Sequence, residues 1–290
     1  MISSNPIGVF DSGFGGLTVY KALRDALPQE DFVYLGDMAR LPYGTKSAAT
    51  VAQYALQAAG YLTTENIKLL VVACNTASAL GLPVLRKHLP LLPCFGVIEP
   101  GAEAAAAISS GGRIAVLSTE ATARAGSYVT AIQRYRPKAD VQGLGCSLLV
   151  SLVEEGWWDG VEAEAITRRY LRELGTPGTD YDTLMLGCTH FPPLTPLIRR
   201  LIGPDVPIVD SAVTTAVAVR RHLETTRQGN TQVGAGKSRF IVTDSPERFS
   251  QLAARFVAGE SFRAGENVVH ASLGTPGALA APEKAPKKSA

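Results

Sequence analysis

Short apolar runs alternate with segments of helical spacing along nearly the whole chain. The runs at 7–10, 32–35 and 69–73 have the length of buried strands, and apolar side chains recur every three or four residues between them. The first intervening segment places apolar side chains on one helix face at Leu17, Tyr20, Leu23 and Leu27. The second, after a helix cap at Thr45 or Ser47, does so at Val51, Tyr54, Ala55, Ala58 and Leu62.

The alternation reaches a fourth predicted strand at 95–98 and then starts again. Further strands are predicted at 113–117, 141–144, 183–186, 208–209, 240–242 and 267–270. Helices are predicted at 120–135, 161–174, 212–223 and 245–258, with a turn-rich loop at 228–237. This pattern is typical of parallel sheets flanked by helices on both faces, so the predicted fold class is α/β.

The restart suggests a diverged internal duplication. Asp11 ends the first predicted strand, and Thr119 follows the corresponding strand of the second half. The chain length from Asp11 to Cys74 is close to that from Thr119 to Cys188. We therefore expect two halves of similar build, each with a cysteine at the end of an equivalent strand.

Composition narrows the class of protein. The chain has 290 residues, 46% hydrophobic and 19% charged, with a net charge of +2, so it offers no basic surface for nucleic acid. It has neither the start of a secretory signal nor an apolar run of the roughly 18 residues that a membrane span needs. Its four cysteines lack C-x-x-C spacing and fit free thiols in a reducing cytosol. We expect a cytoplasmic enzyme that binds neither nucleic acid nor membrane.

The two cysteine frames, KLLVVACNTAS and DTLMLGCTHFP, carry the clearest chemical signal. Cys74 and Cys188 each follow a predicted buried strand, and side chains at the carboxyl ends of parallel strands face the ligand crevice. A helix beginning directly after each cysteine would favour its thiolate. Two such thiols predict one crevice with an acid/base group on each wall.

Three other interpretations of these cysteines remain open from the residues alone. Cysteines are often plain core residues. Cys74 and Cys188 could also join Asp11 and His190 in a mixed zinc site, although the spacing is not that of a structural zinc motif. A disulfide between the two cysteines is a further option, which a reducing cytosol disfavours.

Polar residues beside the predicted strand ends suit an amino-acid ligand. In DSGFGGLT, at 11–18, glycines allow close backbone approach, and Asp11 disfavours a phosphate. LPYGTKS, at 41–47, is either a plain turn or a ligand-facing backbone at Tyr43 and Gly44. Hydroxyl and amide groups that could bind carboxylate and ammonium groups follow other strands at Asn75, Thr76, Thr119, Thr122 and Thr189. His190 could tune the Cys188 thiol or donate to a substrate oxygen.

Together, the motifs DSGFGGLT, LGD, LPYG, VVACNTAS and LGCTHFP closely resemble the glutamate racemases of the aspartate/glutamate racemase superfamily, over about residues 6–270. The chain departs from many relatives at Phe191 and Ser118, and neither change removes a catalytic group. The resemblance implies a cofactor-independent enzyme that supplies D-glutamate for peptidoglycan synthesis and cell wall biogenesis. It also implies two pseudo-symmetric domains, each a mostly parallel sheet flanked by helices, with the active site in the cleft between them.

The domain boundaries follow from the restart and the resemblance together. The first domain is expected to span 1–98 plus 210–272, and the return of the C-terminal segment to it is implied mostly by the resemblance. The second domain is expected at 99–209. The Ala-, Pro- and Lys-rich segment 275–290 is predicted to be a disordered tail.

By the same resemblance, Cys74 and Cys188 are the proton-transfer residues, with Cys74 serving the D-enantiomer and Cys188 the L-enantiomer. Asp11 and His190 are implied as their polar partners, and Glu154 as a further carboxylate. The implied substrate contacts are Asp11, Ser12, Tyr43, Gly44, Asn75, Thr76, Thr189 and His190. The predicted ligands are D- and L-glutamate, with no metal, and a homodimer is one option for the assembly.

Two other functions remain open at this point. A racemase of a related amino acid such as aspartate would share most of these motifs. A two-lobed amino-acid-binding protein without catalysis would bind the ligand but would not exchange its α-hydrogen.

Overall fold

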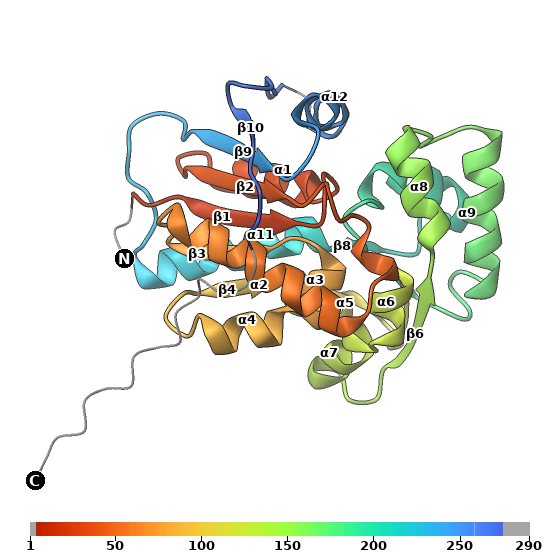
Figure 1. Ribbon diagram of the computed structural model, residues 1–290. Coiled ribbons are helices and arrows are strands. Elements are labelled where there is room, and N and C mark those ends of the chain that lie inside the picture. Colours follow the sequence, from red (N-terminus) through yellow and green to blue (C-terminus); the bar gives the residue numbers. More distant parts are fainter. Residues whose placement is uncertain (1–3, 258, 275–290) are drawn as a thin grey trace, which may run out of the picture.

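The computed structural model describes residues 4–257 and 259–274. Its strands form two sheets, and every strand pairing described within them is parallel (Figure 1). The first sheet has the order β10-β9-β2-β1-β3-β4, with bounds Val268–His270, Ser238–Val242, Phe32–Gly36, Ile7–Asp11, Leu69–Val72 and Cys94–Gly96. The second has the order β6-β5-β7-β8, with bounds Asp140–Gly145, Arg113–Ser118, Thr183–Gly187 and Ile208–Asp210. These parallel sheets confirm the predicted α/β class.

The two sheets repeat one strand order. In the first, β2 and β3 flank β1, and β4 lies outside β3; in the second, β6 and β7 flank β5, and β8 lies outside β7. Cys74 follows β3 and Cys188 follows β7, so the two cysteines follow equivalent strands. The C-terminal strands β9 and β10 extend the first sheet beyond β2. The pseudo-symmetric build is confirmed, and the residue boundaries of the two domains stay a prediction.

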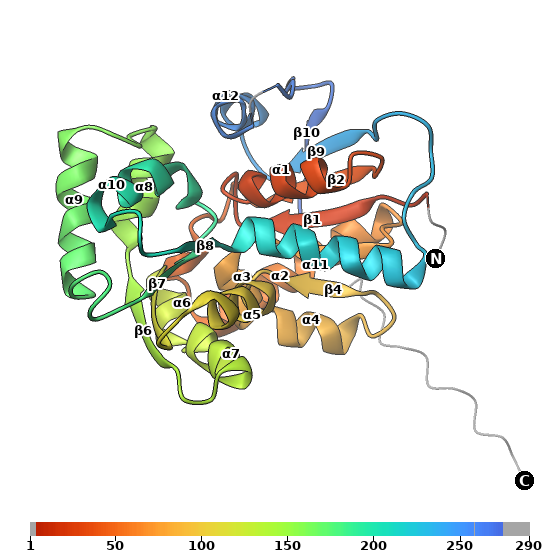
Figure 2. The same ribbon diagram turned by 180° about the vertical axis from the view of Figure 1, so that it is seen from behind.

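Helices cover both faces of each sheet. On one face of the first sheet, the core includes side chains from α1 (Leu17–Ala26), α11 (Ser211–Thr226) and α12 (Pro246–Phe256). On its other face, the core includes α2 (Ala48–Thr64), α3 (Asn75–Leu80) and α4 (Leu82–His88). Figure 2 shows β8 leading directly into α11, which connects the second sheet to the first.

The second sheet is layered in the same way. One face packs against α8 (Ser147–Glu155), α9 (Val161–Glu173) and α10 (Thr195–Ile202), and the other against α5 (Ile98–Ile108) and α7 (Ser127–Tyr135). The short helix α6 (Glu120–Arg124) follows β5. Two 3₁₀ turns, η1 (Tyr43–Thr45) and η2 (Pro192–Leu194), complete the elements near the strand ends.

Strand residues alternate between the two faces, as the pleat requires. In β1, Val9 belongs to the core under α1, whereas Phe10 belongs to the core under α2. Both side chains are fully buried, and each such burial contributes roughly 1.5–3 kcal/mol to folding. The sheets thereby hold their C-terminal ends, and the turns that follow them, in fixed positions.

Several sequence expectations need correction. The helix predicted at 120–135 is two helices, because Gly126 adopts a left-handed conformation with φ of 62° between α6 and α7. The strand predicted at 95–98 ends at Gly96, and α5 begins at Ile98 with Pro100 in its first turn, where a missing N–H costs no hydrogen bond.

Other differences concern helices that were not predicted and the bounds of predicted ones. The helices α4, α5 and α8 were not predicted, and the helix predicted directly after Cys188 is α10, which begins only at Thr195. The helix predicted at 245–258 is α12, which begins at Pro246 and ends at Phe256; residue 258 and the predicted tail at 275–290 lie outside the described residues. Among the helices that residues 4–257 and 259–274 form, none has the length and apolar character needed to cross a membrane.

Candidate active site

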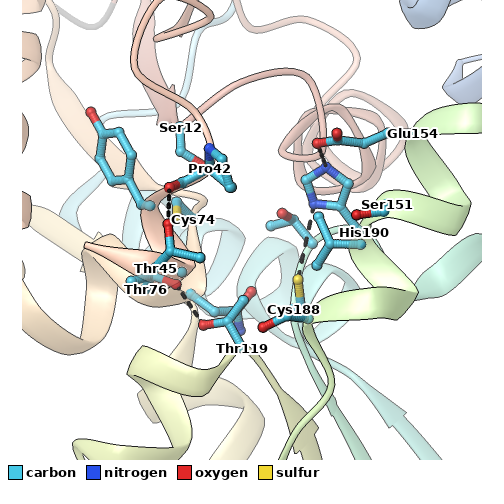
Figure 3. A pocket seen from close by; sticks show the side chains of 16 residues that line it. Ser12, Pro42, Thr45, Cys74, Thr76, Thr119, Ser151, Glu154, Cys188 and His190 are labelled. Carbon is cyan, nitrogen blue, oxygen red and sulfur yellow. Dashed lines mark hydrogen bonds and ion pairs between the residues drawn. The ribbon is translucent and has the colours of Figure 1, made fainter.

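A cavity of about 220 Å³ contains both cysteines predicted to carry the chemistry. Its size is below the roughly 300–1,000 Å³ of pockets for drug-sized ligands, so it suits a smaller molecule. Figure 3 shows Cys74 and Cys188 on opposite walls. The cavity is lined by Ser12, Pro42, Tyr43, Gly44, Thr45, Cys74, Asn75, Thr76, Thr119, Ser147, Val150, Ser151, Glu154, Cys188, Thr189 and His190.

Cys74 lies at the N-terminus of a helix, as predicted. It is the N-cap of α3, and its Sγ accepts a hydrogen bond from the backbone N–H of Ala77 at 3.4 Å. The contact with the helix N-terminus lowers the pKa of the Cys74 thiol, as predicted, but other effects outweigh it. Burial, together with the negative charge of Asp11, raises the pKa of the Cys74 thiol to about 12. A single weak contact to the helix N-terminus does not offset these two effects.

Asp11 lies close enough to Cys74 to raise its pKa, but it does not line the cavity itself. It ends β1 and is fully buried, and its Oδ2 accepts the backbone N–H of Gly13 at 2.9 Å. Its Oδ1 has no hydrogen-bond partner among the described residues. Burial raises the pKa of the Asp11 carboxyl, and the positive charge of His190 acts in the opposite direction. The carboxyl therefore couples electrostatically to both walls.

Cys188 lies in a different environment. The helix expected directly after it is absent there: the chain passes through η2 first, and α10 begins only at Thr195. The neighbour of the Cys188 thiol is instead His190, with 4.0 Å between Sγ and Nδ1. Pro192 and Pro193 open η2, where neither ring nitrogen can donate a backbone hydrogen bond.

His190 connects Cys188 to a carboxylate. Its Nε2 lies 3.3 Å from Oε1 of Glu154, which α8 supplies (Figure 3). Burial lowers the pKa of His190, but its contacts with Cys188 and Glu154 outweigh burial and raise the pKa to about 10. At neutral pH the ring is thus an imidazolium, which stabilises negative charge on the adjacent sulfur.

The glycine-rich turn between β1 and α1 packs closely against the loop that carries Cys188. A methyl group on Gly15 would lie 2.5 Å from the His190 ring, so a glycine is required for this approach. Thr18 donates its hydroxyl to the backbone oxygen of Thr189 at 3.1 Å, and the Phe14 ring meets the His190 ring edge-on at 5.4 Å. Of this motif only Ser12 lines the cavity, whereas Phe14, Gly15 and Thr18 contact the opposite wall at Thr189 and His190.

Three buried threonine hydroxyls form a cluster where the two walls meet. Thr76 and Thr119 lie 2.9 Å apart, and Thr122 lies 3.0 Å from Thr119 and 3.3 Å from Thr76. Thr119 also caps α6 by accepting the backbone N–H of Thr122. Thr76 and Thr119 line the cavity, whereas Thr122 lies behind them. Through Thr76 and Thr119, the cluster can donate hydrogen bonds to a ligand in the cavity.

The LPYG segment forms another part of the lining. Tyr43 donates its hydroxyl to Oδ2 of buried Asp37, which also accepts hydrogen bonds from Arg40 at 2.6 Å and Thr243 at 2.9 Å. This network fixes the η1 turn so that Gly44 faces the cavity. The ligand-facing interpretation of this segment fits its position, although the residues' contacts with a substrate stay a prediction.

Sequence reasoning missed one side of the cavity. Ser147, Val150 and Ser151 on α8 line it, and none of them was predicted. The apolar spacing of Leu149, Val150, Leu152 and Val153 is helical and could have revealed this helix. Within the described part of the chain, no group of three or more His, Cys, Asp or Glu side chains has a metal-binding arrangement.

Comparisons with known proteins agree with this geometry. The family model "Asp/Glu/Hydantoin racemase" matches residues 7–219. A glutamate racemase from Geobacter metallireducens is 47% identical, covering 88% of this chain and 93% of the relative. Two solved structures are similar over 94% of this chain and 99% of each relative. One is a glutamate racemase from Thermus thermophilus in complex with β-chloro-D-alanine, at 42% identity and a TM-score of 0.84. The other is a glutamate racemase from Francisella tularensis in complex with D-glutamate, at 33% identity and a TM-score of 0.86. The chain therefore belongs to the Asp/Glu/Hydantoin racemase family, and it is an amino-acid racemase of the glutamate racemase group.

Proposed function

We propose that this enzyme interconverts L- and D-glutamate by transferring protons between the substrate and two cysteines, Cys74 and Cys188. The observation that carries the proposal is the placement of both sulfurs on opposite walls of one small cavity. A substrate held between them presents one face of its α-carbon to each sulfur. Relatives at 33 to 47% identity, named as glutamate racemases, support glutamate as the substrate.

The proposed reaction needs one thiolate and one thiol at rest. The His190 imidazolium stabilises negative charge on Cys188, and burial keeps Cys74 as the thiol. For L-glutamate, Cys188 removes the α-proton, and Cys74 delivers its own proton to the opposite face of the α-carbon. The roles reverse for D-glutamate, which reacts with the form that this first turnover leaves, with Cys74 as the thiolate and Cys188 as the thiol. A negative charge on Cys188 is also among the causes that raise the pKa of Cys74, so the two sulfurs resist simultaneous ionisation.

The carbanion that forms between the two steps carries charge on the α-carboxylate. Placed hydroxyl and amide donors in a closed cavity can stabilise that charge more than water would. Candidate donors are Ser12, Asn75, Thr76, Thr119 and Thr189. We propose that they bind the substrate's carboxylate and ammonium groups with Tyr43 and the backbone at Gly44, that Thr122 supports Thr76 and Thr119, and that no cofactor takes part.

The wider role and organisation follow from the family. We propose that the D-glutamate formed enters peptidoglycan synthesis in the cytoplasm. We also propose that the two sheets belong to two domains, at 1–98 with 210–272 and at 99–209, that meet at the cavity.

Hydrogen exchange tests the proposal directly. The purified protein is incubated with L- or D-glutamate in deuterated buffer containing a metal chelator and no added cofactor. We expect optical rotation to decay to zero from either enantiomer, with deuterium entering the α-position of the product. Failure of both enantiomers to gain deuterium would overturn the proposal. Racemisation of aspartate in preference to glutamate would keep the chemistry but correct the substrate.

A further inference from the structure

Tyr128 lies between the two cysteine-bearing turns and contacts both. It belongs to α7, is buried with 3% of its surface exposed, and does not line the cavity. Its hydroxyl accepts a hydrogen bond from Asn75 Nδ2 at 2.7 Å, and Asn75 directly follows Cys74. Its ring lies against Gly187, which directly precedes Cys188: a methyl group on Gly187 would lie 2.8 Å from Tyr128 Cε2.

The hydroxyl of Tyr128 also belongs to a chain of polar contacts that ends on β7. Ser211 contacts the Tyr128 hydroxyl, accepts a hydrogen bond from Asn75 Nδ2 at 3.5 Å, and donates to the backbone oxygen of Leu186 at 3.3 Å. Leu186 precedes Cys188 by two residues. The chain from Asn75 through Tyr128 and Ser211 to Leu186 therefore links the Cys74 turn to the strand that carries Cys188.

We propose that Tyr128 is a positioning residue for racemisation: its ring and hydroxyl together fix the separation of the Cys74 and Cys188 turns. The inference rests on the proposed function, because it concerns the distance between the two sulfurs that act on one carbon. Proton transfer requires reacting atoms within about 3–3.5 Å, so a small change in this separation slows one transfer or both. Burial suits this role, since a packed ring cannot move independently of the strands around it.

The test compares two identical substitutions on one helix. Tyr128→Phe keeps the ring but removes the nearer of the two acceptors of the Asn75 amide, whereas Tyr135→Phe alters an exposed tyrosine at the far end of α7. We expect Tyr128→Phe to lower kcat about tenfold in both directions, equivalent to ~1.4 kcal/mol, with KM nearly unchanged. The primary deuterium isotope effect with α-deuterated glutamate should rise, because proton transfer then limits turnover more strongly. Tyr135→Phe should match the unmodified enzyme in all three measurements.

A second substitution tests whether the hydroxyls act as one chain. Ser211→Ala removes the next link, so the double variant Tyr128→Phe/Ser211→Ala should be no slower than the slower single variant. Additive losses would mean that the two hydroxyls act separately. A Tyr128→Phe enzyme with unchanged kcat and isotope effect would overturn the proposal, as would a lower melting temperature with an unchanged isotope effect, which indicates a merely structural role.

A structural readout separates this inference from the proposed function. Crystal structures of the unmodified and Tyr128→Phe proteins give the Sγ–Sγ separation without any assay. We expect it to change by about 0.5 Å, the tolerance of a catalytic arrangement, and an unchanged separation would contradict the inference. If the unmodified protein does not racemise glutamate, the proposed function fails, while this measurement still decides whether Tyr128 sets the distance.

Discussion

The two walls of the cavity are built from the same strand arrangement but hold their cysteines in different electrostatic surroundings. Cys74 and Cys188 both follow the third strand of a repeated order. Cys74 caps α3 and lies near the carboxyl of Asp11, and its pKa is raised to about 12. Cys188 has no helix directly after it and lies beside the His190 imidazolium.

The repeated fold and the residues around each cysteine contribute different properties to the site. The repeat sets geometry, because equivalent strands place a sulfur on each wall. The neighbours set charge, because an anion disfavours a second negative charge beside Cys74, whereas a cation favours one on Cys188. A two-base racemase needs this asymmetry: two thiols could not remove a proton, and two thiolates could not return one.

Removing either sulfur should have the largest effect. We expect Cys74→Ser and Cys188→Ser each to lower racemisation by about 10²–10⁴-fold, the usual contribution of a positioned acid or base. The two variants should also differ in the enantiomer for which they retain a base. Cys74→Ser retains the base for L-glutamate, so any residual solvent exchange should favour that enantiomer, and Cys188→Ser should favour D-glutamate. Deuterium incorporation by mass spectrometry measures both, and full activity in either variant would contradict the two-base scheme.

Removing the cation from the Cys188 wall should have the next largest effect. His190→Asn deletes the group that stabilises charge on Cys188, so we expect kcat to fall by about 10–100-fold. His190 loses its proton near pH 10, so the alkaline decrease of kcat/KM in the unmodified enzyme should include a limb there that this variant lacks. A variant with the unmodified pH profile would show that His190 does not set the charge.

Removing the Glu154 carboxylate, which lies beside His190, should have a smaller effect on the alkaline limb of the pH profile. Glu154→Gln removes a contact that raises the pKa of His190, so the alkaline limb should shift to lower pH. Glu155, the adjacent exposed carboxylate, provides the matched control, and Glu155→Gln should leave the profile in place. An identical shift in both variants would indicate a general charge effect.

The smallest expected effect concerns stability. The pKa of His190 is raised in the folded protein, so its stabilisation is complete below about pH 6.5, the unfolded value, and is lost as pH rises towards about 10. The difference in unfolding free energy between the unmodified protein and His190→Asn should therefore shrink across this range. Denaturant unfolding at several pH values measures it, and a constant difference would contradict the assigned protonation.

The shared cavity of the two cysteines could be predicted from the sequence, but the charged groups around each sulfur could not. Buried strands ending in Cys74 and Cys188 are a local pattern, so the shared cavity could be anticipated. The partnership of His190 with Glu154 could not be worked out from residue patterns, because it joins a turn to a distant helix that the pattern reading missed. The raised pKa of Cys74 depends on burial and on Asp11 from another strand, which are properties of the packed structure.

The proposed reaction depends above all on two sulfurs that face one cavity in different electrostatic surroundings. The most direct measurement is the pH dependence of alkylation at Cys74 and Cys188, followed separately by peptide mass spectrometry with a small neutral reagent. We expect glutamate to protect both sites, and Cys74 labelling to rise only as pH approaches about 12. Equal labelling of both cysteines with one pH dependence, or protection of only one by glutamate, would contradict the account.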